Sequence, residues 1–508
     1  MIERMRDIML LGIDIGTSGT KTVLFNHDGS TVASYTAEYP LYQPENGWAE
    51  QEPSDWWQAV CISIKGVIEK SGIKADDIKG IGLSGQMHGL VMLDKEDRVL
   101  RRSIIWCDQR TSKECSEITG IVGKKRLIDI TANPALTGFT ASKVRWVQNN
   151  EPEIYARCKK ILLPKDYIRY MLTGEFATEV SDASGMQFLD VPNRSWSKEL
   201  LELLGVDISY LPKVYESYEI SGRITVGAAA LTSLKAGTPV VGGGGDQAAG
   251  AVGNGIVRQG IVSSTIGTSG VVFAHTDKPL IDPLGRVHTF CHAVPGCWHI
   301  MGVTQAAGLS LKWFRDNFCE KEIEEAEKQG IDPYVIMDKM AAEVTSDGVY
   351  YLPYLMGERT PHLNADARGV FFGLSAIHTK AHLIRAVLEG VCFSLLDCMD
   401  IIRALGVDTS GVRVSGGGGR SPLWRQMQAD MFNCEVQVIN SSEGPALGVA
   451  LLAGVGTGIY KNVSEACDAA IKVTKNYKAD TDFSKIYLKN HILYKELYDA
   501  LKDKFKKN

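Results

Sequence analysis

A four-residue motif that occurs twice, half a chain apart, constrains the fold more than any other feature. Gly-Thr-Ser-Gly stands at residues 16–19 and again at 267–270 of 508 residues. Both copies follow a β-forming run, in LGIDIGTSGTKTVLF and in STIGTSGVVFA. Four common small residues can recur by chance, but the shared context and the half-length spacing favour two related domains facing each other across a cleft.

The two copies differ in one respect, because only the first is preceded by an acid, Asp14, where the second has Thr265. A turn of small residues between strands presents backbone N–H groups and hydroxyls that suit phosphate oxygens. It is not a P-loop, since Thr20 separates Gly19 from Lys21, and no G-x-G-x-x-G opens a helix after the first strand. Each turn taken alone is equally compatible with an ordinary hairpin.

Length and composition indicate a soluble two-domain protein. A chain of 508 residues exceeds one hydrophobic core, and 44% hydrophobic with 23% charged residues is ordinary for a soluble protein. A net charge of −5 argues against nucleic acid, and no apolar run reaches the ~18 residues of a membrane span. Arg4 and Arg6 precede only a short apolar run, which makes a poor signal peptide. Eleven scattered cysteines without C-x-x-C suit a reducing cytoplasm.

Short strands alternate with helices, which predicts an α/β fold with mainly buried sheets. Strands are expected at 9–25, 31–38, 78–84, 104–106, 239–241, 261–273 and 412–415. Helices are expected at 53–70, with Ser54 or Asp55 near the cap, and at 306–316, 422–432 and 444–454, followed by an amphipathic C-terminal helix. Small residues dominate 248–255 and 446–454, which either join the two domains or pack within one.

Two glycine runs stand at the ends of predicted strands. Gly242–Gly245 lets the backbone pass close to a bulky group, and Asp246 follows it at the strand exit. A carboxylate there is well placed to take a proton from a substrate hydroxyl, although Asp246 could also be a helix N-cap. Gly416–Gly419 joins a strand to a helix and offers a surface for an adenine ring or a phosphate.

Polar residues follow two further strands. SGQMHG presents Gln86, Met87 and His88, and WCDQR presents Trp106 and Asp108. Strand ends are where α/β proteins place ligands, and an aromatic ring among polar groups suits a sugar. The segment HTFCHAVPGCWH, at 288–299, has histidines and cysteines whose spacing matches no usual zinc signature, so a packing role is favoured over a metal site.

Nearly the whole chain resembles the FGGY carbohydrate kinases, a branch of the actin/hexokinase-like ATPases. GIDIGTSGTK and STIGTSG resemble the two phosphate loops of the family, and VSGGGGRSPLWRQMQAD resembles its adenosine segment. GFTASKVRWVQNN and GVFFGLSAIHTKAHLIRAVLEG are similar to the two family signatures. SGQMHG, LPKDY and LPYLMGERTPH are similar to segments of the members that act on xylulose.

The resemblance implies two ribonuclease-H-like domains with a cleft between them: residues 1–250 for the sugar and 251–508 for the nucleotide. It implies ATP and Mg²⁺, with Asp246 as catalytic base and Asp14 positioning the metal, through water. The implied sugar-binding residues are Gln86, Met87, His88, Trp106, Asp108 and Asp246. The implied ATP-binding residues are Thr17, Ser18, Gly267, Thr268, Gly308, Gly417, Gly418 and Gly419.

The expected reaction is ATP-dependent phosphorylation of D-xylulose to its 5-phosphate by a cytoplasmic monomer or homodimer. The alternatives are another sugar kinase of the family, acting on ribulose, gluconate, fuculose or glycerol, or a non-catalytic actin-like nucleotide or sugar sensor. One departure from the family is Gln247, where many relatives have Asn. An unperturbed aspartate pKa of about 3.9 would leave Asp246 ionised at neutral pH.

Overall fold

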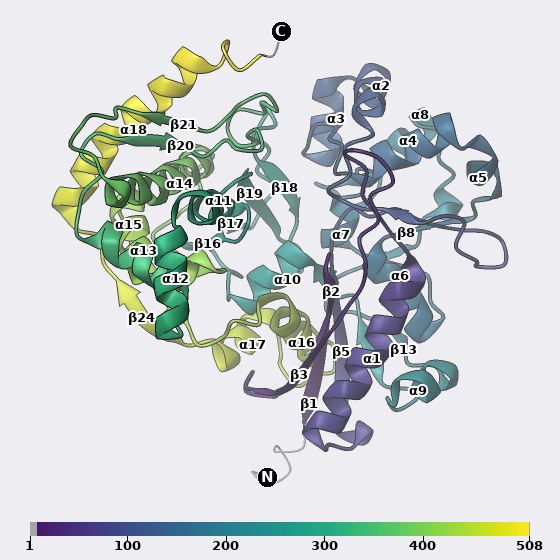
Figure 1. Cartoon of the computed structure of the whole chain (residues 1–508). Helices are drawn as coiled ribbons and strands as arrows, with labels where there is room; N and C mark the ends of the chain where they lie inside the picture. The colour runs from purple at the N-terminus through teal and green to yellow at the C-terminus, as the bar shows by residue number, and fades with distance from the viewer. Residues whose placement is uncertain (1–7, 507–508) are drawn as a thin grey trace.

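The computed structural model describes residues 8–506 and contains two large mixed sheets, each with helices packed on it (Figure 1). The first sheet has the order β13-β14-β5-β1-β2-β3, and β15 extends the pairing with β5. Its strands are β1 (Met9–Ile15), β2 (Gly19–Asn26), β3 (Thr31–Glu38), β5 (Ile78–Gly85), β13 (Ile220–Arg223), β14 (Pro239–Val241) and β15 (Gly244–Gly245).

The second sheet has the order β18-β19-β17-β16-β22-β23-β24. Its strands are β16 (Ile261–Ile266), β17 (Gly270–Thr276), β18 (His288–Cys291), β19 (Trp298–Thr304), β22 (Gly411–Ser415), β23 (Glu435–Ile439) and β24 (Val473–Tyr477). Shorter paired strands lie outside both sheets: β4 (Glu50–Gln51), β6 (Val91–Leu93), β7 (Ser103–Ile104), β8 (Lys160–Leu162), β9 (Ala177–Glu179), β10 (Leu189–Asp190), β11 (Ser195–Trp196), β12 (Lys213–Tyr215), β20 (Tyr350–Leu352) and β21 (Val370–Phe372).

The two sheets share one topology. In the first, β1, β2 and β3 are antiparallel neighbours and β5 is parallel to β1. In the second, β16, β17 and β19 repeat the antiparallel trio and β22 is parallel to β16. The repeated motif therefore occupies equivalent turns, β1–β2 and β16–β17. The predicted α/β class with two related domains is confirmed.

The helices cover both faces of the sheets (Figure 1). In the first half they are α1 (Pro53–Ser71), α2 (Ser112–Val122), α3 (Lys124–Thr131), α4 (Thr140–Asn150), α5 (Pro152–Arg157), α6 (Pro164–Thr173), α7 (Val180–Ser184), α8 (Lys198–Leu203), α9 (Val226–Thr232) and α10 (Asp246–Gly253). In the second half they are α11 (Gly308–Phe318), α12 (Glu320–Gln329), α13 (Pro333–Ala342), α14 (Lys380–Ala404), α15 (Pro422–Phe432), α16 (Gly444–Gly456), α17 (Val463–Ala470) and α18 (Thr481–Leu501).

Helix α1 shows how the sequence builds the first layer. Pro53 at its start has a φ suited to the first turn, and Trp56, Val60 and Ile64 form a buried stripe against β2 and β3. Ser54 and Asp55, expected near the cap, lie in the first turn, and the N-cap itself is Glu52, which makes no side-chain capping bond. Because proline has no N–H group, the first turn has one unpaired donor fewer and depends less on a capping side chain.

Two small-residue helices, α10 and α16, pack against each other between the two halves (Figure 1). A Cβ on Gly448 would lie 1.8 Å from the Ala249 carbonyl oxygen, and one on Gly253 would lie 1.8 Å from the Gly444 carbonyl oxygen. Helix α16 belongs to the second half of the chain but also packs on the first sheet, where Gly12 and Gly82 admit its backbone. The prediction that these helices lie where the domains touch is confirmed.

The halves also touch at the edge formed by β18 and β19. The Asn133 side-chain amide donates to the Thr289 carbonyl (2.9 Å), and the Cys291 N–H donates to Ser184 Oγ (3.0 Å). Trp298 Nε1 donates to the Val191 carbonyl at 2.8 Å. The two halves are thus in contact at two separate places, the α10–α16 crossing and the β18–β19 edge.

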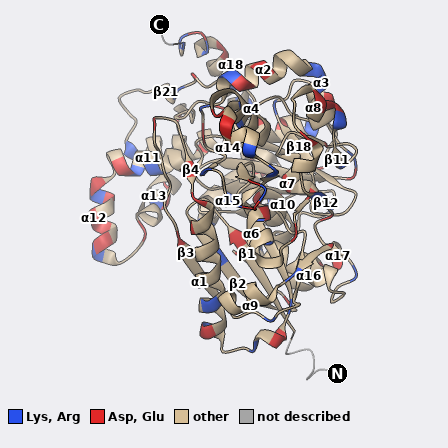
Figure 2. Ribbon diagram, turned by 90° about the vertical axis from the view of Figure 1, so that its right-hand side faces the viewer, with Lys and Arg blue, Asp and Glu red and all other residues tan. Residues whose placement is uncertain are grey.

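No helix within residues 8–506 is long and apolar enough to cross a membrane. Figure 2 shows acidic and basic residues interspersed along the ribbon, with α12 as a mainly acidic helix.

Candidate active site

The first turn ends β1 next to a carboxylate. The Gly16 N–H donates to the Gly19 carbonyl at 3.0 Å, which closes the turn. Asp14, one residue before the end of β1, has a buried Oδ1 that accepts no hydrogen bond from any residue the structure describes. Burial raises the pKa of Asp14. Lys21 pairs across the hairpin with Asp14 and forms an ion pair of 2.5 Å with Glu443, just before α16.

The second turn is docked on the N-terminus of α11. The Gly308 N–H donates to the Gly267 carbonyl at 2.9 Å, and the Leu309 N–H donates to the Thr268 carbonyl at 3.1 Å. A Cβ at Gly308 would lie 2.4 Å from the Gly267 oxygen, so only glycine allows this approach. The turn is therefore held against the start of α11 by the first two N–H groups of that helix.

A cavity of about 960 Å³ opens beside the second turn. It is lined by five of the predicted nucleotide residues: Gly267, Thr268, Gly308, Gly417 and Gly418. The opposite wall comes from α13, with Tyr334, Asp338 and Lys339. Sequence reasoning missed this wall because Pro333–Ala342 carries no motif. The volume falls in the range typical of sites for small molecules and cofactors.

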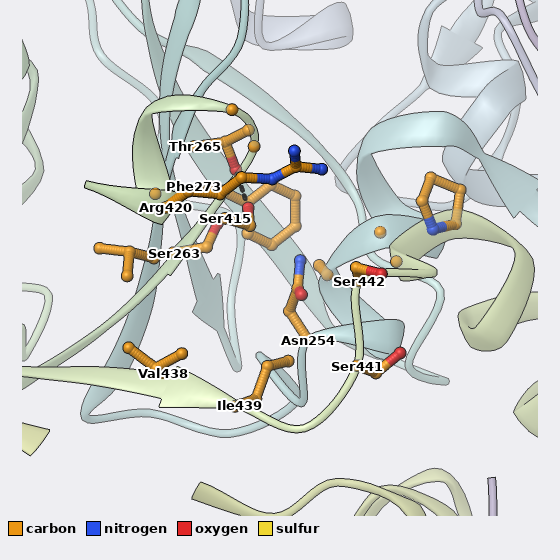
Figure 3. A pocket seen from close by; sticks show the side chains of 18 of the residues that line it. Asn254, Ser263, Thr265, Phe273, Ser415, Arg420, Val438, Ile439, Ser441 and Ser442 are labelled. Carbon is orange, nitrogen blue, oxygen red and sulfur yellow. Dashed lines mark hydrogen bonds between the residues drawn. The ribbon is translucent and has the colours of Figure 1, made fainter. Parts of the chain in front are cut away.

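A second cavity, of about 520 Å³, lies on the other side of the glycine run 416–419 (Figure 3). Gly417 and Arg420 line both cavities, and Gly419 lines the second. Thr265 and Ser415 join their hydroxyls at 2.7 Å on one wall. Figure 3 shows Arg420 and Asn254 extending toward the middle of this space. The two cavities therefore adjoin at Gly417 and Arg420, the larger being walled by α13 and the smaller by Asp246.

Asp246 is the first residue of α10 and lines the smaller cavity. The N-cap of α10 is Gly245, so the alternative role of Asp246 as N-cap is wrong. Burial and then the nearby charge of Asp14 raise the pKa of Asp246 to about 7. The expectation of an unperturbed carboxylate is therefore wrong as well, because Asp246 is buried and lies near the carboxylate of Asp14.

The SGQMHG segment lies at the end of β5, next to the same carboxylate. Gln86 is buried and donates to Gln51 Oε1 at 2.7 Å, which ties it to the first turn. Met87 packs beneath Gly245, whose added Cβ would meet Met87 Cγ at 2.9 Å. His88 has a φ of 70° and a ring nitrogen 3.0 Å from the Gly185 carbonyl. Burial lowers its pKa to about 3, so the ring is neutral.

His88 lies close to aromatic side chains from both halves. Its ring centroid is 4.8 Å from that of Phe139 and 6.2 Å from that of Phe290 on β18.

Trp106 contacts the first turn. Its side chain is 44% exposed and donates from Nε1 to Thr17 Oγ1 at 2.9 Å. In the same turn, the Ser18 carbonyl accepts from the Tyr39 N–H. Thr17 and Ser18 line neither cavity.

Asp108 is fully buried and its carboxylate is already bonded. Arg110 lies 2.7 Å from Oδ2, and the Ala49 N–H donates to the same oxygen at 2.6 Å. Its role as a sugar ligand stays a prediction. The strand expected at 104–106 ends at Ile104 instead, because the chain turns there toward Trp106.

The histidine and cysteine segment packs as a core. His299 stacks on Phe273 with centroids 4.3 Å apart, and His288 stacks on Phe290 at 5.8 Å. Within residues 8–506, His275, Asp277 and Cys297 are the residues whose potential metal-ligand atoms lie within 4.8 Å of one another. Two of them already contact each other, because His275 Nε2 lies 2.9 Å from Asp277 Oδ1. The arrangement agrees with the favoured packing role.

Two sheets of one topology with a nucleotide-sized cavity at the second turn place the chain in the two-domain α/β class of ribonuclease-H-like folds. The chain belongs to the FGGY family of carbohydrate kinases. The N-terminal domain of that family matches residues 9–253, and its C-terminal domain matches residues 262–457.

Similar proteins span the whole chain. A xylulose kinase of Escherichia coli K12 is 40% identical over 97% of this chain and 99% of its own length. A gluconokinase of Bacillus licheniformis is 34% identical over 98% of this chain and 96% of its own. A crystal structure described as a xyloylose kinase from Brucella ovis, 36% identical, superposes with a TM-score of 0.89 and covers 97% of this chain and 99% of that one.

Proposed function

We propose that this chain transfers the γ-phosphoryl group of ATP to D-xylulose, giving D-xylulose 5-phosphate. The observation that carries the proposal is the position of Asp246 in the wall of a cavity that shares Gly417 and Arg420 with a neighbouring, nucleotide-sized cavity. Membership of the carbohydrate kinase family and the similarity to a xylulose kinase over nearly all of both chains support the choice of substrate.

In this proposal residues 251–508 hold the nucleotide and residues 1–250 hold the sugar. The base and ribose of ATP lie in the larger cavity, between α13 and the glycines Gly417 and Gly418. The polyphosphate passes Gly267, Thr268 and Gly308 toward Gly419, along backbone whose glycines leave room for it. Thr17 and Ser18, in the first turn, meet its terminal phosphate from the opposite side.

The proposal assigns Mg²⁺ to Asp14. Its buried Oδ1, without a hydrogen-bond donor among the described residues, has the free lone pairs that a metal-bound water needs. When bound with ATP, the ion neutralises charge on the phosphates. Thr265 stands in the matching place of the second strand, and one strongly placed carboxylate suffices for one ion.

Asp246 acts in the proposal as the base that takes the proton of the attacking sugar hydroxyl. Phosphoryl transfer has a loose transition state, so catalysis is mainly positioning and charge neutralisation. A base with a pKa of about 7 is matched to neutral pH. Met87 and neutral His88 hold the sugar at this point, Trp106 covers its C–H face, and Gln86 and Asp108 complete the proposed pocket.

The test is a coupled assay of ADP release with ATP and Mg²⁺ over D-xylulose, D-ribulose, gluconate, fuculose and glycerol. By far the highest kcat/KM for D-xylulose is expected. If gluconate gave the highest kcat/KM, the substrate would be gluconate, the second candidate, which the similarity to a gluconokinase supports. No sugar-dependent ADP release above background would overturn the kinase proposal in favour of a sensor. Asp246→Ala should bind ATP and sugar and transfer almost no phosphate.

The proposal also places the enzyme in the cytoplasm, where ATP is available, as a monomer or homodimer. All eleven cysteines are free thiols, which suits that reducing compartment. Its partners are the two small-molecule substrates, without nucleic acid or membrane.

A further inference from the structure

Five charged side chains that the mechanism above does not use are buried behind Asp246. They are Lys165, Asp166 and Arg169 on α6, Glu179 at the start of α7, and Asp182 on α7; we call them the Lys165 cluster. Every one of these side chains has 0% exposure. Two cations face three carboxylates, so the cluster carries a net charge of −1 when all are ionised.

Lys165 is the centre of the cluster. Its Nζ lies 2.7 Å from Asp166 Oδ1, 3.4 Å from Asp182 Oδ2 and 3.6 Å from Glu179 Oε1. Burial lowers the pKa of Lys165, but the three carboxylates outweigh burial and the net shift is upward. A buried lysine of this kind stays charged only because of its partners.

The cluster holds the glycine run that leads to Asp246. Arg169 donates to the carbonyls of Val241 and Gly242, both at 2.5 Å. Ser181 Oγ on α7 accepts from the Gly245 N–H at 3.1 Å, one residue before Asp246. Glu179 in turn caps α7, accepting from the N–H groups of Ser181 and Asp182 at 2.7 and 2.9 Å. The backbone on both sides of the flexible glycines is therefore fixed by charged side chains.

The cluster also sets the charge around Asp246. Neither oxygen of Asp182 accepts a hydrogen bond from the described residues, and Lys165 is its nearest cation. Burial raises the pKa of Asp182, and the charge of Asp246 raises it further, so the two carboxylates interact. Without Lys165, uncompensated negative charge would remain beside the base.

The other charged groups around Asp246 are few. Asp14 on β1 faces it, with Lys21 and Glu443 behind Asp14. Helix α16 carries no charged side chain, and on α17 Glu465 bonds to the Lys461 N–H while Asp468 pairs with Arg258. Asp14 and the Lys165 cluster are thus the two sources of charge that face Asp246.

We propose that Lys165 is a positioning residue for Asp246, which neutralises the carboxylates of α7 and so fixes both the place and the proton affinity of the base. The proposal rests on the proposed function for its kinetic consequence. Replacing a buried ion pair by apolar residues is often neutral for stability, so stability alone does not explain the cluster.

The test compares the pH profile of kcat/KM in Lys165→Met, Asp182→Asn and the double variant. Since the base must be deprotonated, kcat/KM rises with pH through an acid limb near pH 7. Lys165→Met should move this limb up by about one pH unit and Asp182→Asn should move it down by a similar amount. The double variant restores the net charge of −1 and should bring the limb back.

Asp397→Asn is the matched control, because Asp397 is also buried and bonded to one partner, His491 at 2.8 Å, but lies in the second half. It should leave the acid limb unchanged. The proposal is overturned if Lys165→Met and Asp182→Asn leave the limb in place or move it in the same direction. Should Lys165→Met not fold, Asp182→Asn against the control decides.

A second readout needs no turnover. The folded-state pKa of Asp246 lies above its value in the unfolded chain, so its protonated form stabilises the fold at low pH and this contribution is lost as pH rises to about 7. The unfolding free energy relative to Asp246→Asn should stop falling near pH 7. That pH should rise with Lys165→Met and fall with Asp182→Asn; an unchanged pH contradicts the cluster's role even if no sugar is phosphorylated.

Discussion

At the scale of single residues, Asp246 shows how a fold changes the chemistry of a side chain. Its place at the strand exit follows from the glycine run, but its raised pKa follows from burial and from Asp14, 232 positions earlier in the chain. A side chain acts best as a general base when its pKa lies near the working pH.

Asp246→Asn should lower kcat by about 10²- to 10⁴-fold, because the amide cannot accept the proton of the sugar hydroxyl. The same substitution should raise the free energy of unfolding at pH 8, where the wild-type carboxylate is ionised beside Asp14. Steady-state kinetics and urea unfolding at pH 5 and 8 measure both effects. An equal stability difference at the two pH values would contradict the raised pKa.

His88→Asn should raise the KM for the sugar about tenfold while the KM for ATP stays unchanged. Asparagine tolerates the φ of 70°, so the backbone is preserved and only the ring is lost. Because the pKa of His88 is about 3, wild-type sugar binding should show no histidine titration between pH 5 and 8. An equal rise of both KM values would place His88 outside the sugar pocket.

At the scale of elements, the crossing of α10 and α16 depends on glycine. Gly448→Ala places a Cβ 1.8 Å from the Ala249 carbonyl oxygen and should destabilise the fold by about 1–3 kcal/mol. Gly120→Ala in α2 is the control, since its Cβ meets nothing within 4 Å and alanine favours the helix by about 1 kcal/mol. Denaturant unfolding of both variants measures the contrast; similar effects in both would contradict the close crossing.

The elements that sequence predicts best are those with local signals. Helix α15 spans Pro422–Phe432 as predicted, with Ser421 accepting from the Trp424 N–H and Pro422 at its start. The helix expected at 306–316 begins two residues later, at Gly308, because the Gly308 N–H bonds to the distant Gly267 carbonyl. Local patterns cannot show such a bond.

The site divides in the same way. Asp246, Gly417 and the two turns carry local motifs, and the sequence predicts them as site residues. The α13 wall and the nearness of Asp14 to Asp246 depend on which elements meet in space. Helix α16 is apolar on all sides, so its periodicity gave no indication that it covers the first sheet.

At the scale of the whole molecule, the two halves are interlocked, since α16 from the second half packs on the first sheet and α10 crosses it. We expect one cooperative thermal transition, with equal calorimetric and van't Hoff enthalpies. ADP at about 100 times its Kd should stabilise that single transition by about 2.7 kcal/mol. Differential scanning calorimetry with and without ADP measures this; two separated transitions would contradict the interlock.

The interlock also has a consequence for synthesis of the chain on the ribosome. The last strand of the first sheet ends at Gly245, but the helix that covers Gly12 and Gly82 is complete only at Gly456, 211 residues later. At about 5–20 residues per second, the emerging sheet waits roughly 10–40 s with an apolar face open. A chaperone that shields this face during translation would therefore increase the yield of folded protein more than one added after release.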